Sequence, residues 1–287
     1  MEGIIKAVCI SEKRGTVKKN INEVKVIKDF GLEGDAHAGK WHRQVSFLSA
    51  DIVDEFNEKG ASVIEGDFGE NVLVYGIDFK KLPVGTKLIC NDVKFEVTQI
   101  GKECHSHCEI YKRVGDCIMP REGIFAKVLE GGMIKVGDKI KVIYPDKDMP
   151  YQAAVITLSD KGSRGERVDT SGPKASEILR EHGFEIIEEI LLPDEMAQIK
   201  KELIRLSDSR QVDLIITTGG TGLSPRDCTP EATLAVADRN VPGIAEAIRA
   251  GSMTITKRAM LSRGVSVTRK KTLIINCLLY TSPSPRD

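Results

Sequence analysis

The pattern of apolar residues changes at residues 144–151, and this change limits the possible folds more than any other feature of the sequence. The segment reads Tyr-Pro-Asp-Lys-Asp-Met-Pro-Tyr and fits neither a strand nor a helix. Short apolar or alternating runs precede it, whereas strand and helix patterns alternate after it. The 287 residues are enough for two domains with separate cores. We predict a domain at 1–144, a linker at 145–151 and a second domain at 152–276.

The first domain is predicted to be rich in β-strands. Its expected strands are residues 3–10, 22–26, 44–48, 70–74, 86–89, 93–100 and 139–143. One helix is expected at residues 49–59, with Ser49 as its N-cap and Gly60 just beyond its end. Many short strands and a single helix favour a barrel-like β domain.

The second domain is predicted to be an α/β fold. Its expected strands are residues 153–158, 185–192, 212–217 and 273–275, and its expected helices are 171–182, 195–206 and 229–238. Pro173 lies in the first turn of the first of these helices and Gly183 follows its end. This alternation predicts a mainly parallel sheet with right-handed crossovers and helices on both faces.

Composition restricts the partners that we expect. Lys plus Arg and Asp plus Glu both number 42, so the formal net charge is zero and nothing global indicates nucleic acid or an anionic membrane. No apolar run reaches the roughly 18 residues of a membrane span, and the first residues do not resemble a signal peptide. The seven cysteines are an odd number, which favours reduced thiols. We therefore expect a cytoplasmic protein.

Polar residues follow three of the predicted parallel strands, at the edge where ligands bind in such sheets. Ser159 and Asp160 follow the first strand, Asp194 the second, and the glycine-rich run 219–222 with Asp227 the third. The glycines would let backbone N–H groups approach a phosphate closely. No Walker lysine follows, so Mg²⁺ held by Asp194 or Asp227 would offset phosphate charge. The alternative is a tight turn beside solvated aspartates.

Five stretches of the second domain occur in the same order in one known family. They are residues 156–160 (Ile-Thr-Leu-Ser-Asp), 192–195 (Leu-Pro-Asp-Glu), 217–222 (Thr-Thr-Gly-Gly-Thr-Gly) with 226–233 (Arg-Asp-Cys-Thr-Pro-Glu-Ala-Thr), 241–243 (Val-Pro-Gly) and 261–263 (Leu-Ser-Arg). On these residues, the region from Ala153 to Asn276 resembles the molybdopterin-binding domain of the MogA/MoaB type.

This resemblance implies a molybdopterin adenylyltransferase, which transfers AMP from ATP to molybdopterin and releases pyrophosphate. It assigns Asp194 and Asp227 to Mg²⁺–ATP. The expected phosphate cradle consists of Gly219, Gly220, Thr221 and Gly222, and the expected pterin or phosphate contacts are Ser159, Asp160, Ser262 and Arg263. The resemblance also implies a homotrimer that works with other proteins of molybdenum cofactor biosynthesis. Pyridoxal phosphate is not expected.

Three features near these motifs have other interpretations. Arg226 could pair with phosphate or be a solvated surface residue, and Thr229 is first expected to be a helix N-cap. Residues 277–287 depart from the family pattern and are expected to be a non-native tail. On that interpretation the domain is truncated and part of the pterin pocket is missing.

The first domain contains a cluster of sulfur and imidazole groups. Cys104, His105, His107 and Cys108 lie within one short stretch, and Cys117 follows. These residue types can bind zinc, although no second Cys-x-x-Cys pair completes a tetrahedron. They could also be buried, inert thiols. A third interpretation is a thiolate with a pKa lowered by a neighbouring imidazolium or by Lys102, suited to sulfur or molybdenum chemistry.

Other parts of the first domain resemble the MOSC family, found in molybdenum cofactor sulfurases. The matching stretches are residues 31–39 (Gly-Leu-Glu-Gly-Asp-Ala-His-Ala-Gly), 43–46 (Arg-Gln-Val-Ser), 66–71 (Gly-Asp-Phe-Gly-Glu-Asn) and 120–126 (Pro-Arg-Glu-Gly-Ile-Phe-Ala). The family implies a β-barrel and a cysteine that carries sulfur or contacts molybdenum. By position Cys108 is the first candidate, followed by Cys104 and Cys117.

Several polar residues of the first domain remain open between binding and structure. The cofactor could be contacted by Asp35, His37, His42, Arg43 and Arg121, or these residues could form turns and surface ion pairs. Glu70 and Asn71 are expected to stabilise a turn. Trp41, the single tryptophan, is expected in the core, although it could cover a pterin ring.

The two resemblances together predict a protein of molybdenum cofactor biosynthesis, with a back domain that adenylylates molybdopterin and a front domain that binds, sulfurates or passes on the cofactor. Two other functions stay open. The chain could be a non-catalytic carrier, because a fold does not determine activity. The front domain could alternatively be a molybdenum-dependent reductase with Cys108 as metal ligand.

Overall fold

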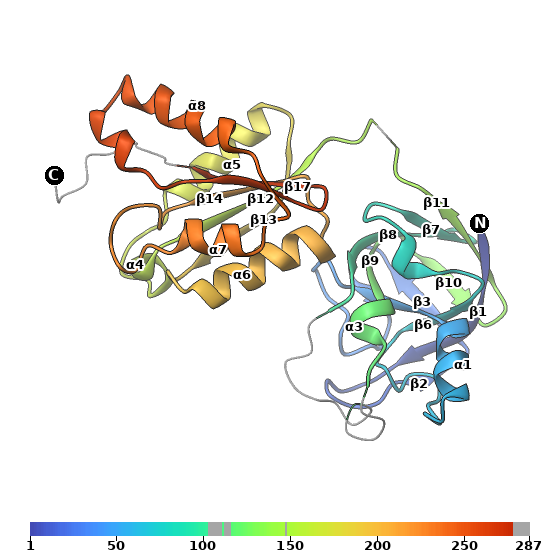
Figure 1. Ribbon diagram of the computed structural model, residues 1–287. Coiled ribbons are helices and arrows are strands. Elements are labelled where there is room, and N and C mark those ends of the chain that lie inside the picture. Colours follow the sequence, from blue (N-terminus) through green and yellow to red (C-terminus); the bar gives the residue numbers. More distant parts are fainter. Residues whose placement is uncertain (103–110, 112–115, 147, 278–287) are drawn as a thin grey trace. The chain divides into compact units, whose positions relative to one another are not determined.

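The chain divides into two compact units, Met1–Lys147 and Asp148–Asp287, in a computed structural model (Figure 1). The structure describes residues 1–102, 111, 116–146 and 148–277. The division falls inside the proline-containing segment 144–151. Across the described residues, no helix has both the length and the apolar character needed to cross a membrane.

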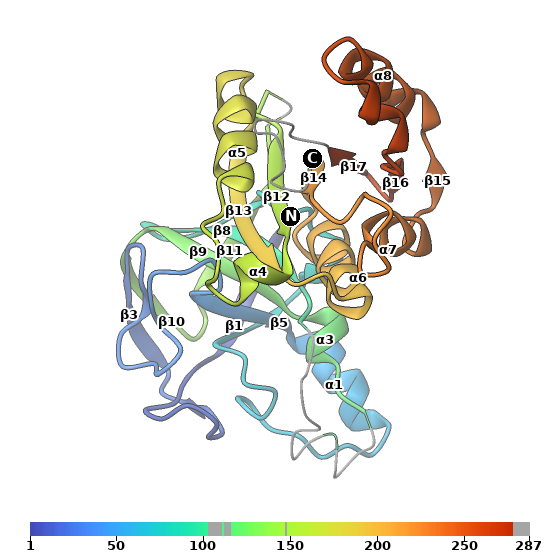
Figure 2. The ribbon, with the colours of Figure 1, turned by 90° about the vertical axis from the view of Figure 1, so that its left-hand side faces the viewer.

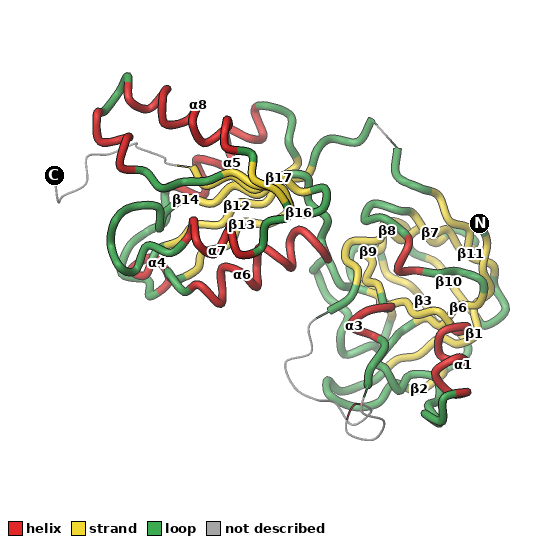
Figure 3. Tube along the Cα trace, in the orientation of Figure 1, coloured by secondary structure: helices red, strands yellow, loops and turns green. Residues whose placement is uncertain are grey.

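The first unit is a closed β-barrel of seven strands (Figure 3). The barrel strands, in spatial order, are β1 (Glu2–Ile10), β6 (Val72–Tyr75), β5 (Val45–Ser49), β9 (Ile124–Glu130), β8 (Val93–Ile100), β7 (Lys87–Cys90) and β11 (Lys139–Ile143). Pairing of β1 with β11 closes the ring, and only β5 and β6 run parallel within it. Closure leaves the ring without a free edge, which protects the strands from pairing with another chain.

Smaller elements cover the barrel. Strand β2 (Lys19–Asn20) extends β1, and a separate small sheet contains β10 (Gly132–Lys135), β3 (Glu23–Ile27) and β4 (Gly31–Leu32). The described helices of this unit are α1 (Ala50–Glu58), η1 (Phe79–Lys81) and α3 (Met119–Glu122). Ser49 is the N-cap of α1 as predicted, although its hydroxyl accepts no capping hydrogen bond and instead donates to Asp51 Oδ2 at 3.4 Å.

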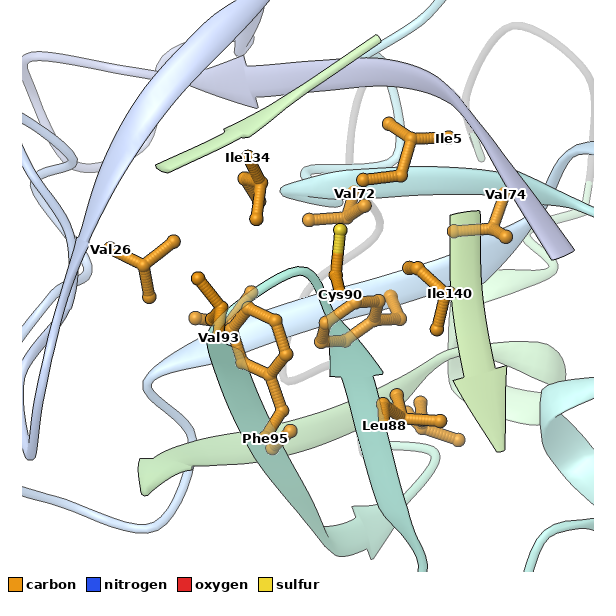
Figure 4. Close-up of a cluster of buried hydrophobic side chains, with 14 of the residues drawn as sticks. Ile5, Val26, Val72, Val74, Leu88, Cys90, Val93, Phe95, Ile134 and Ile140 are labelled. Atoms are coloured by element: carbon orange, nitrogen blue, oxygen red, sulfur yellow. The ribbon is translucent and has the colours of Figure 1, made fainter. Parts of the chain in front are cut away.

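The barrel interior is filled by aliphatic and aromatic side chains, because alternate residues of each strand point inward. Figure 4 shows Leu88, Cys90 and Phe95 directed toward Val72 and Ile140 from the opposite side. All five are at most 1% exposed. Phe95 also meets Phe47 edge-on, with ring centroids 5.1 Å apart. This unit therefore has a solid core, and any ligand must bind on its outside.

The second unit is an α/β fold with a six-stranded sheet. The strands, in spatial order, are β13 (Glu185–Leu192), β12 (Gln152–Leu158), β14 (Leu214–Thr218), β17 (Thr272–Cys277), β16 (Ser266–Arg269) and β15 (Arg239–Asn240). The first four run parallel and the last two are antiparallel. The predicted mainly parallel sheet and the β-barrel of the first unit are both confirmed.

Helices lie on both faces of this sheet, as predicted. Figure 1 shows α5 (Ser171–Glu181) and α8 (Pro242–Met253) on one side, and α6 (Met196–Ile204) and α7 (Thr229–Ala235) on the other. Figure 2 shows the same order of strands from a perpendicular direction. The short elements of the unit are α4 (Asp160–Ser163), the π-helical turn η2 (Arg205–Ser209) and η3 (Lys257–Leu261).

The sequence missed several elements. Strands β9, β10, β15 and β16 and helix α8 were not predicted. The prediction that Thr229 caps α7 is wrong, because Cys228 occupies the N-cap position and Thr229 is the first helical residue. The Thr229 hydroxyl instead donates to the carbonyl oxygen of Gly219, at 3.1 Å.

Candidate functional site

The glycine-rich turn 219–222 follows β14 and has a backbone that only glycine fits at its centre. Gly220 has φ +62°, and a Cβ atom there would lie 2.2 Å from the Thr229 hydroxyl oxygen and 2.7 Å from Asp194 Oδ1. Gly219 has φ +99°, and a Cβ there would lie 2.2 Å from the carbonyl oxygen of Leu158. The turn is therefore packed directly against α7 and against the carboxyl ends of the neighbouring strands.

The turn directs its carbonyl groups inward and leaves its N–H groups available. Thr229 donates a hydrogen bond to each of two carbonyl oxygens of the turn. Its N–H donates to Gly220 O (3.2 Å) and its hydroxyl donates to Gly219 O. Within the described part of the chain, no backbone N–H of residues 219–222 donates a hydrogen bond. Unpaired backbone N–H groups are uncommon in folded proteins, and consecutive ones form anion-binding concavities.

Asp160 and Asp194 lie beside this turn and hold each other in place. The N–H of Asp160 donates to Asp194 Oδ2 (3.2 Å), and the N–H of Asp194 donates to Asp160 Oδ1 (3.1 Å). Asp194 Oδ1 is buried and has no hydrogen-bond partner among the described residues. Burial raises the pKa of Asp194, and repulsion from Asp160 and Asp227 adds to the shift. A cation at this oxygen would relieve both effects.

Asp227 lies on the other side of the turn. Its Oδ2 accepts from the Ser224 N–H (2.9 Å) and would lie 2.8 Å from a Cβ atom added to Gly222. The three predicted carboxylates and the glycine turn are therefore gathered at one edge of the sheet. Among the residues that the structure describes, no three Asp, Glu, His or Cys side chains are arranged to hold a metal ion by themselves.

Arg226 bridges two loops of this site. Its Nε and Nη2 donate to the two oxygens of Asp160 (3.0 and 2.8 Å), and Nη1 donates to Glu195 (2.9 Å). The hydrogen bonds from Arg226 lower the pKa of Asp160 and keep it ionised. The sequence left Arg226 open between a phosphate ligand and a solvated residue, and the structure places it at the site.

Arg263 and Ser262 come from the loop after η3, and of the two Arg263 bonds to the same turn. Arg263 donates to the carbonyl oxygens of Gly222 (2.7 Å) and Asp227 (2.6 Å), and it forms an ion pair with Glu231. Ser262 accepts from the Gly264 N–H at 3.2 Å. In this structure, the Arg263 guanidinium therefore fixes the loop that carries Asp227.

A cavity of about 160 Å³ adjoins the turn on the β12 side. It is lined by Thr157, Leu158, Ser159, Gly162, Arg167, Val168, Asp169, Thr170, Ser171, Thr218 and Gly219. The sequence identified Ser159 and Gly219 but missed the segment 167–171. Asp169 caps α5 by accepting from Ser171 N (2.9 Å) and Gly172 N (3.1 Å), and an aspartate before a helix with proline in its first turn could have indicated this.

The first unit has a larger cavity, of about 590 Å³, on the outside of the barrel. It is lined by Gly15, Thr16, Val17, Lys18, His37, Trp41, Arg43, Ser46, Gly66, Asp67, Phe68, Gly69, Asn71, Lys102, Cys117 and Phe125. We call it the front pocket. Lys18, Arg43 and Lys102 give it cationic character, with Asp67 as its one carboxylate among the lining residues.

A buried ion pair underlies the front pocket. Lys18 Nζ lies 2.9 Å from Asp35 Oδ2, and both side chains are at most 2% exposed. Asp35 also accepts from Ser11 N (3.1 Å) and from Asn71 Nδ2 (3.1 Å). Burial would raise the pKa of Asp35, but Lys18 and these donors bring it below its ordinary value. Asp35, left open between ligand and structure, therefore lies beneath Lys18 as its buried counter-ion and is not among the residues that line the pocket.

Arg43 lies between two aromatic rings on the wall of the front pocket. Its guanidinium carbon is 4.7 Å from the Trp41 ring centroid and 5.5 Å from that of Phe125. Both distances are within the range in which an aromatic ring attracts a guanidinium. Trp41 is 39% exposed and lines the pocket, so the prediction that it packs in the core is wrong. Arg121 forms a bidentate surface pair with Asp116, at 2.9 and 2.8 Å.

The remaining candidates in the first unit have different outcomes. Cys104 and Cys108 lie outside the described residues, as do His105 and His107. Cys117 is 6% exposed and lines the front pocket. His37 also lines the pocket, whereas His42 Nε2 bonds to Gln99 Oε1 at 3.0 Å. Glu70 accepts from the Gly66 N–H at 2.6 Å, which confirms its predicted role in a turn.

Comparison with known proteins finds a family model for each unit. A family model described as "probable molybdopterin binding domain" matches residues 154–283, and one described as "MOSC domain" matches residues 34–141. The chain is 44% identical over 125 residues to the molybdopterin adenylyltransferase of Escherichia coli K12, which covers 42% of this chain and 64% of that protein. The chain thus spans less than two thirds of the length of this relative.

A second adenylyltransferase gives the same result, and one solved structure is also similar. The molybdopterin adenylyltransferase of Helicobacter pylori J99 is 41% identical over 124 residues, covering 42% of this chain and 70% of that protein. A solved structure of MoaB from Thermus thermophilus, described as a molybdopterin biosynthesis enzyme, is 46% identical, with a TM-score of 0.43, and covers 47% of this chain and 83% of that one. The chain therefore belongs to the family of the molybdopterin adenylyltransferases, with a MOSC domain in front of the family's domain.

Proposed function

We propose that the second unit adenylylates molybdopterin with Mg²⁺–ATP as a step of molybdenum cofactor biosynthesis. The observation that carries this proposal is that anion-binding N–H groups and a cation-binding carboxylate oxygen lie side by side at the glycine turn. Among the described residues, the N–H groups of residues 219–222 and Asp194 Oδ1 beside Gly220 have no hydrogen-bond partner. The N–H groups suit phosphate oxygens, and the carboxylate oxygen suits a cation. A nucleotide with its metal ion brings both charges together. The names of the relatives support adenylyl transfer as the chemistry.

The reaction needs no covalent protein group. A phosphate oxygen of molybdopterin attacks the α-phosphorus of ATP, a P–O bond forms, and the bond from that phosphorus to the bridging oxygen breaks as pyrophosphate leaves. Such transfers depend on alignment and on stabilisation of charge at the phosphoryl oxygens. The N–H groups of the glycine turn would bind these oxygens. Arg263 would act through the loop, because its donors hold the carbonyl groups of Gly222 and Asp227.

The residues present fit Mg²⁺. Asp194 and Asp227 would hold it, and the ion would neutralise phosphate charge when bound. Mg²⁺ in nucleotide sites commonly takes only one or two protein carboxylates, with phosphate and water completing its shell. The lack of a group of three such ligands among the described residues is consistent with this mode. Asp160 fixes the orientation of Asp194 through the paired hydrogen bonds.

The small cavity beside the turn would hold part of one substrate. Its wall offers the hydroxyl groups of Thr157, Ser159, Thr170, Ser171 and Thr218. Such groups can both donate and accept, as the heteroatoms of a pterin or the hydroxyls of a ribose require. Ser159 is therefore proposed to contact substrate, while its Oγ also accepts from the Gly162 N–H at 3.1 Å.

Pyrophosphate release tests the proposal. Purified protein with ATP, Mg²⁺ and molybdopterin should release pyrophosphate, and Asp227→Asn should abolish most of the turnover while it retains the fold. Asp238→Asn is the matched control, since Asp238 is exposed on the same unit and accepts only from the Lys270 N–H. No release by the unaltered protein would reject the enzymatic function. Molybdopterin binding that is unaffected in Asp227→Asn, without any turnover in either protein, would identify a carrier.

We also propose that the front pocket binds the anionic cofactor in its maturing form. Arg43 and Lys102 supply positive charge, and Trp41 supplies an aromatic face. Cys117 is the described thiol at this pocket, and Cys108 remains a candidate to carry sulfur or contact molybdenum. Arg43→Gln should reduce the amount of pterin that copurifies with the protein, whereas Arg121→Gln should not. Equal pterin content in the two variants would reject this assignment.

The homotrimer implied by the family is a further proposal. Met253, Ile255, Met260 and Leu261 expose between 44% and 83% of their surface along one stretch of the second unit. Exposed apolar side chains of this kind are typical of surfaces that associate. Analytical ultracentrifugation of the protein should show a species of three times the chain mass of 31.5 kDa. A monomer at all concentrations tested would reject the trimer.

A further inference from the structure

Arg226 is anchored by its backbone, and its side chain is exposed and bonded to carboxylates of two other loops. Its N–H donates to Ser224 Oγ (3.3 Å). The next residue, Asp227, is held by Ser224 through two backbone contacts, and by the Arg263 guanidinium. The Arg226 side chain is nevertheless 54% exposed. The start of the side chain is therefore fixed close to the glycine turn, while the guanidinium can reach different partners.

The present partners of Arg226 can be exchanged at little cost. Asp160 and Glu195 are 27% and 49% exposed, and ion pairs at such positions are weak. Asp160 does not need Arg226 to keep its position, because its backbone and carboxylate are both bonded to Asp194. Release of Arg226 would therefore leave the carboxylate framework of the site intact.

Phosphate is as suitable a partner for this guanidinium as the carboxylates that it contacts here, and a polyphosphate carries more negative charge. The planar fork of arginine matches two oxygens of a phosphate, and charge-assisted pairs of this type are short and strong. The turn 219–222 offers N–H groups but no side-chain cation, and no lysine follows it. Arg226 is the arginine whose guanidinium lies against Asp160 and Glu195 at the exposed rim of the site.

We propose that Arg226 binds the pyrophosphate part of ATP, exchanging Asp160 and Glu195 for phosphate oxygens. This inference rests on the proposed adenylyl transfer. The α-phosphate would lie at the turn, where Thr221 is only 2% exposed, and the leaving group would extend toward the exposed rim. An arginine there stabilises the charge that develops on pyrophosphate as the bond to the α-phosphorus breaks.

Calorimetric binding of three probes to the full chain tests the proposal. Inorganic pyrophosphate, ATP and AMP are each titrated in the presence of MgCl₂. For Arg226→Gln we expect pyrophosphate and ATP affinities to fall about tenfold or more, because a charge-assisted pair is lost, with AMP affinity within about twofold. Arg226→Lys should lie between the two, since lysine keeps the charge but not the fork.

Arg180→Gln is the matched control. Arg180 is also 54% exposed and pairs with a single carboxylate, Glu189, at 2.8 Å in the same unit. The Arg180→Gln variant should bind all three probes as the unaltered protein does. Unchanged pyrophosphate affinity in Arg226→Gln would overturn the Arg226 assignment alone. A loss of AMP affinity as large as the loss of pyrophosphate affinity would do the same. Failure of the unaltered protein to bind ATP or pyrophosphate would overturn the proposed function together with it.

Discussion

Asp160 and Asp194 are joined by two reciprocal hydrogen bonds, in which the backbone N–H of each residue donates to the carboxylate of the other. The two residues follow adjacent parallel strands, β12 and β13, so this exchange locks two loops at the carboxyl edge of the sheet. It also leaves Asp194 Oδ1 buried beside Gly220 without a partner among the described residues. A position that is both fixed and electrostatically unfavourable is typical of a functional site.

Replacement of Asp194 by Asn should separate stability from function. The raised pKa of Asp194 means that its charged form disfavours the fold above the ordinary pKa of an aspartate, so Asp194→Asn should not lower the free energy of unfolding at pH 7. Asn still offers an oxygen to the Asp160 N–H. Affinity for Mg²⁺–ATP should nevertheless fall at least about tenfold. Urea denaturation and calorimetry measure the two effects, and a variant that loses stability but binds Mg²⁺–ATP normally would contradict the assignment.

The same carboxylate gives a pH dependence. Because burial and the nearby Asp160 and Asp227 raise the pKa of Asp194, it becomes neutral at a higher pH than an ordinary aspartate as the solution is acidified. As the pH is lowered, Mg²⁺–ATP affinity should therefore begin to decrease at a higher pH than the range in which exposed aspartates titrate. The Asp194→Asn variant should lack this part of the profile. Identical acidic limbs in both proteins would show that another group is responsible.

Replacement of Gly220 by Ala should abolish binding of phosphate at the turn. The added Cβ would overlap the Thr229 hydroxyl oxygen and Asp194 Oδ1, in addition to the strain of a positive φ. Gly183→Ala isolates that strain, because Gly183 has φ +86° and nothing within 4 Å of the added atom. The control should lose about 1 kcal/mol of stability and keep full pyrophosphate affinity. The prediction fails if Gly220→Ala binds pyrophosphate as well as Gly183→Ala does.

Neutralising Asp35 should destabilise the first unit. Asp35→Asn would leave the Lys18 ammonium buried without a counter-charge, at a cost of about 3 kcal/mol or more, because breaking a buried pair from one side is expensive. Lys18→Met/Asp35→Asn should recover part of this loss. Lys94→Met breaks the exposed pair with Glu130 and should change stability by less than about 1 kcal/mol.

Urea denaturation followed by Trp41 fluorescence measures these stability changes in the first unit, because Trp41 is the only tryptophan and belongs to that unit. Its fluorescence during urea denaturation follows that unit alone, which matters when two units can unfold separately. A loss for Asp35→Asn no larger than for Lys94→Met would mean that Lys18 finds another partner or reaches water.

The carboxylate cluster could be predicted because topology alone determines where it lies. Once three strands are parallel, the residues that follow them meet at one edge, so Ser159, Asp194 and Asp227 could be placed together from sequence order. The glycine turn was found for the same reason. The direction of individual side chains could not be predicted, because it depends on packing. The Thr229 hydroxyl bonds to the turn instead of capping its helix, and Arg263 holds a loop.

The front pocket was harder to predict because its walls come from distant parts of the chain. Lys18 gave no sequence signal, yet it lines the pocket and is paired with the buried Asp35. The position of Arg43 near Trp41 and Phe125 depends on the pairing of β5 with β9, which joins an arginine and a phenylalanine 82 residues apart (125 minus 43). Strands β9 and β10 were missed because glycines 123, 131 and 132 interrupt their pattern.

Glu70 should make the stability of the first unit fall between about pH 4.5 and pH 7. Burial raises its pKa from 4.5 to about 7, although the N–H groups of Gly66 and Glu70 and the charge of Lys18 oppose the shift. The folded state therefore binds more protons than the unfolded state within that window, so stability falls as pH rises and is lowest above pH 7. Below pH 4.5 both states are protonated and the penalty disappears.

Glu70→Gln tests this directly, because glutamine keeps the acceptor for the Gly66 N–H and cannot ionise. The free energy of unfolding of Glu70→Gln is compared with that of the unaltered protein at each pH. The difference should be up to about 3 kcal/mol more favourable to the variant at pH 8 than at pH 4, which corresponds to the shift of the carboxyl pKa. Urea denaturation followed by Trp41 fluorescence at the two pH values gives this difference. Other groups that titrate in both proteins cancel in the comparison. A difference that is the same at pH 4 and pH 8 would mean that Glu70 is ionised in the folded protein and finds a partner for its second oxygen.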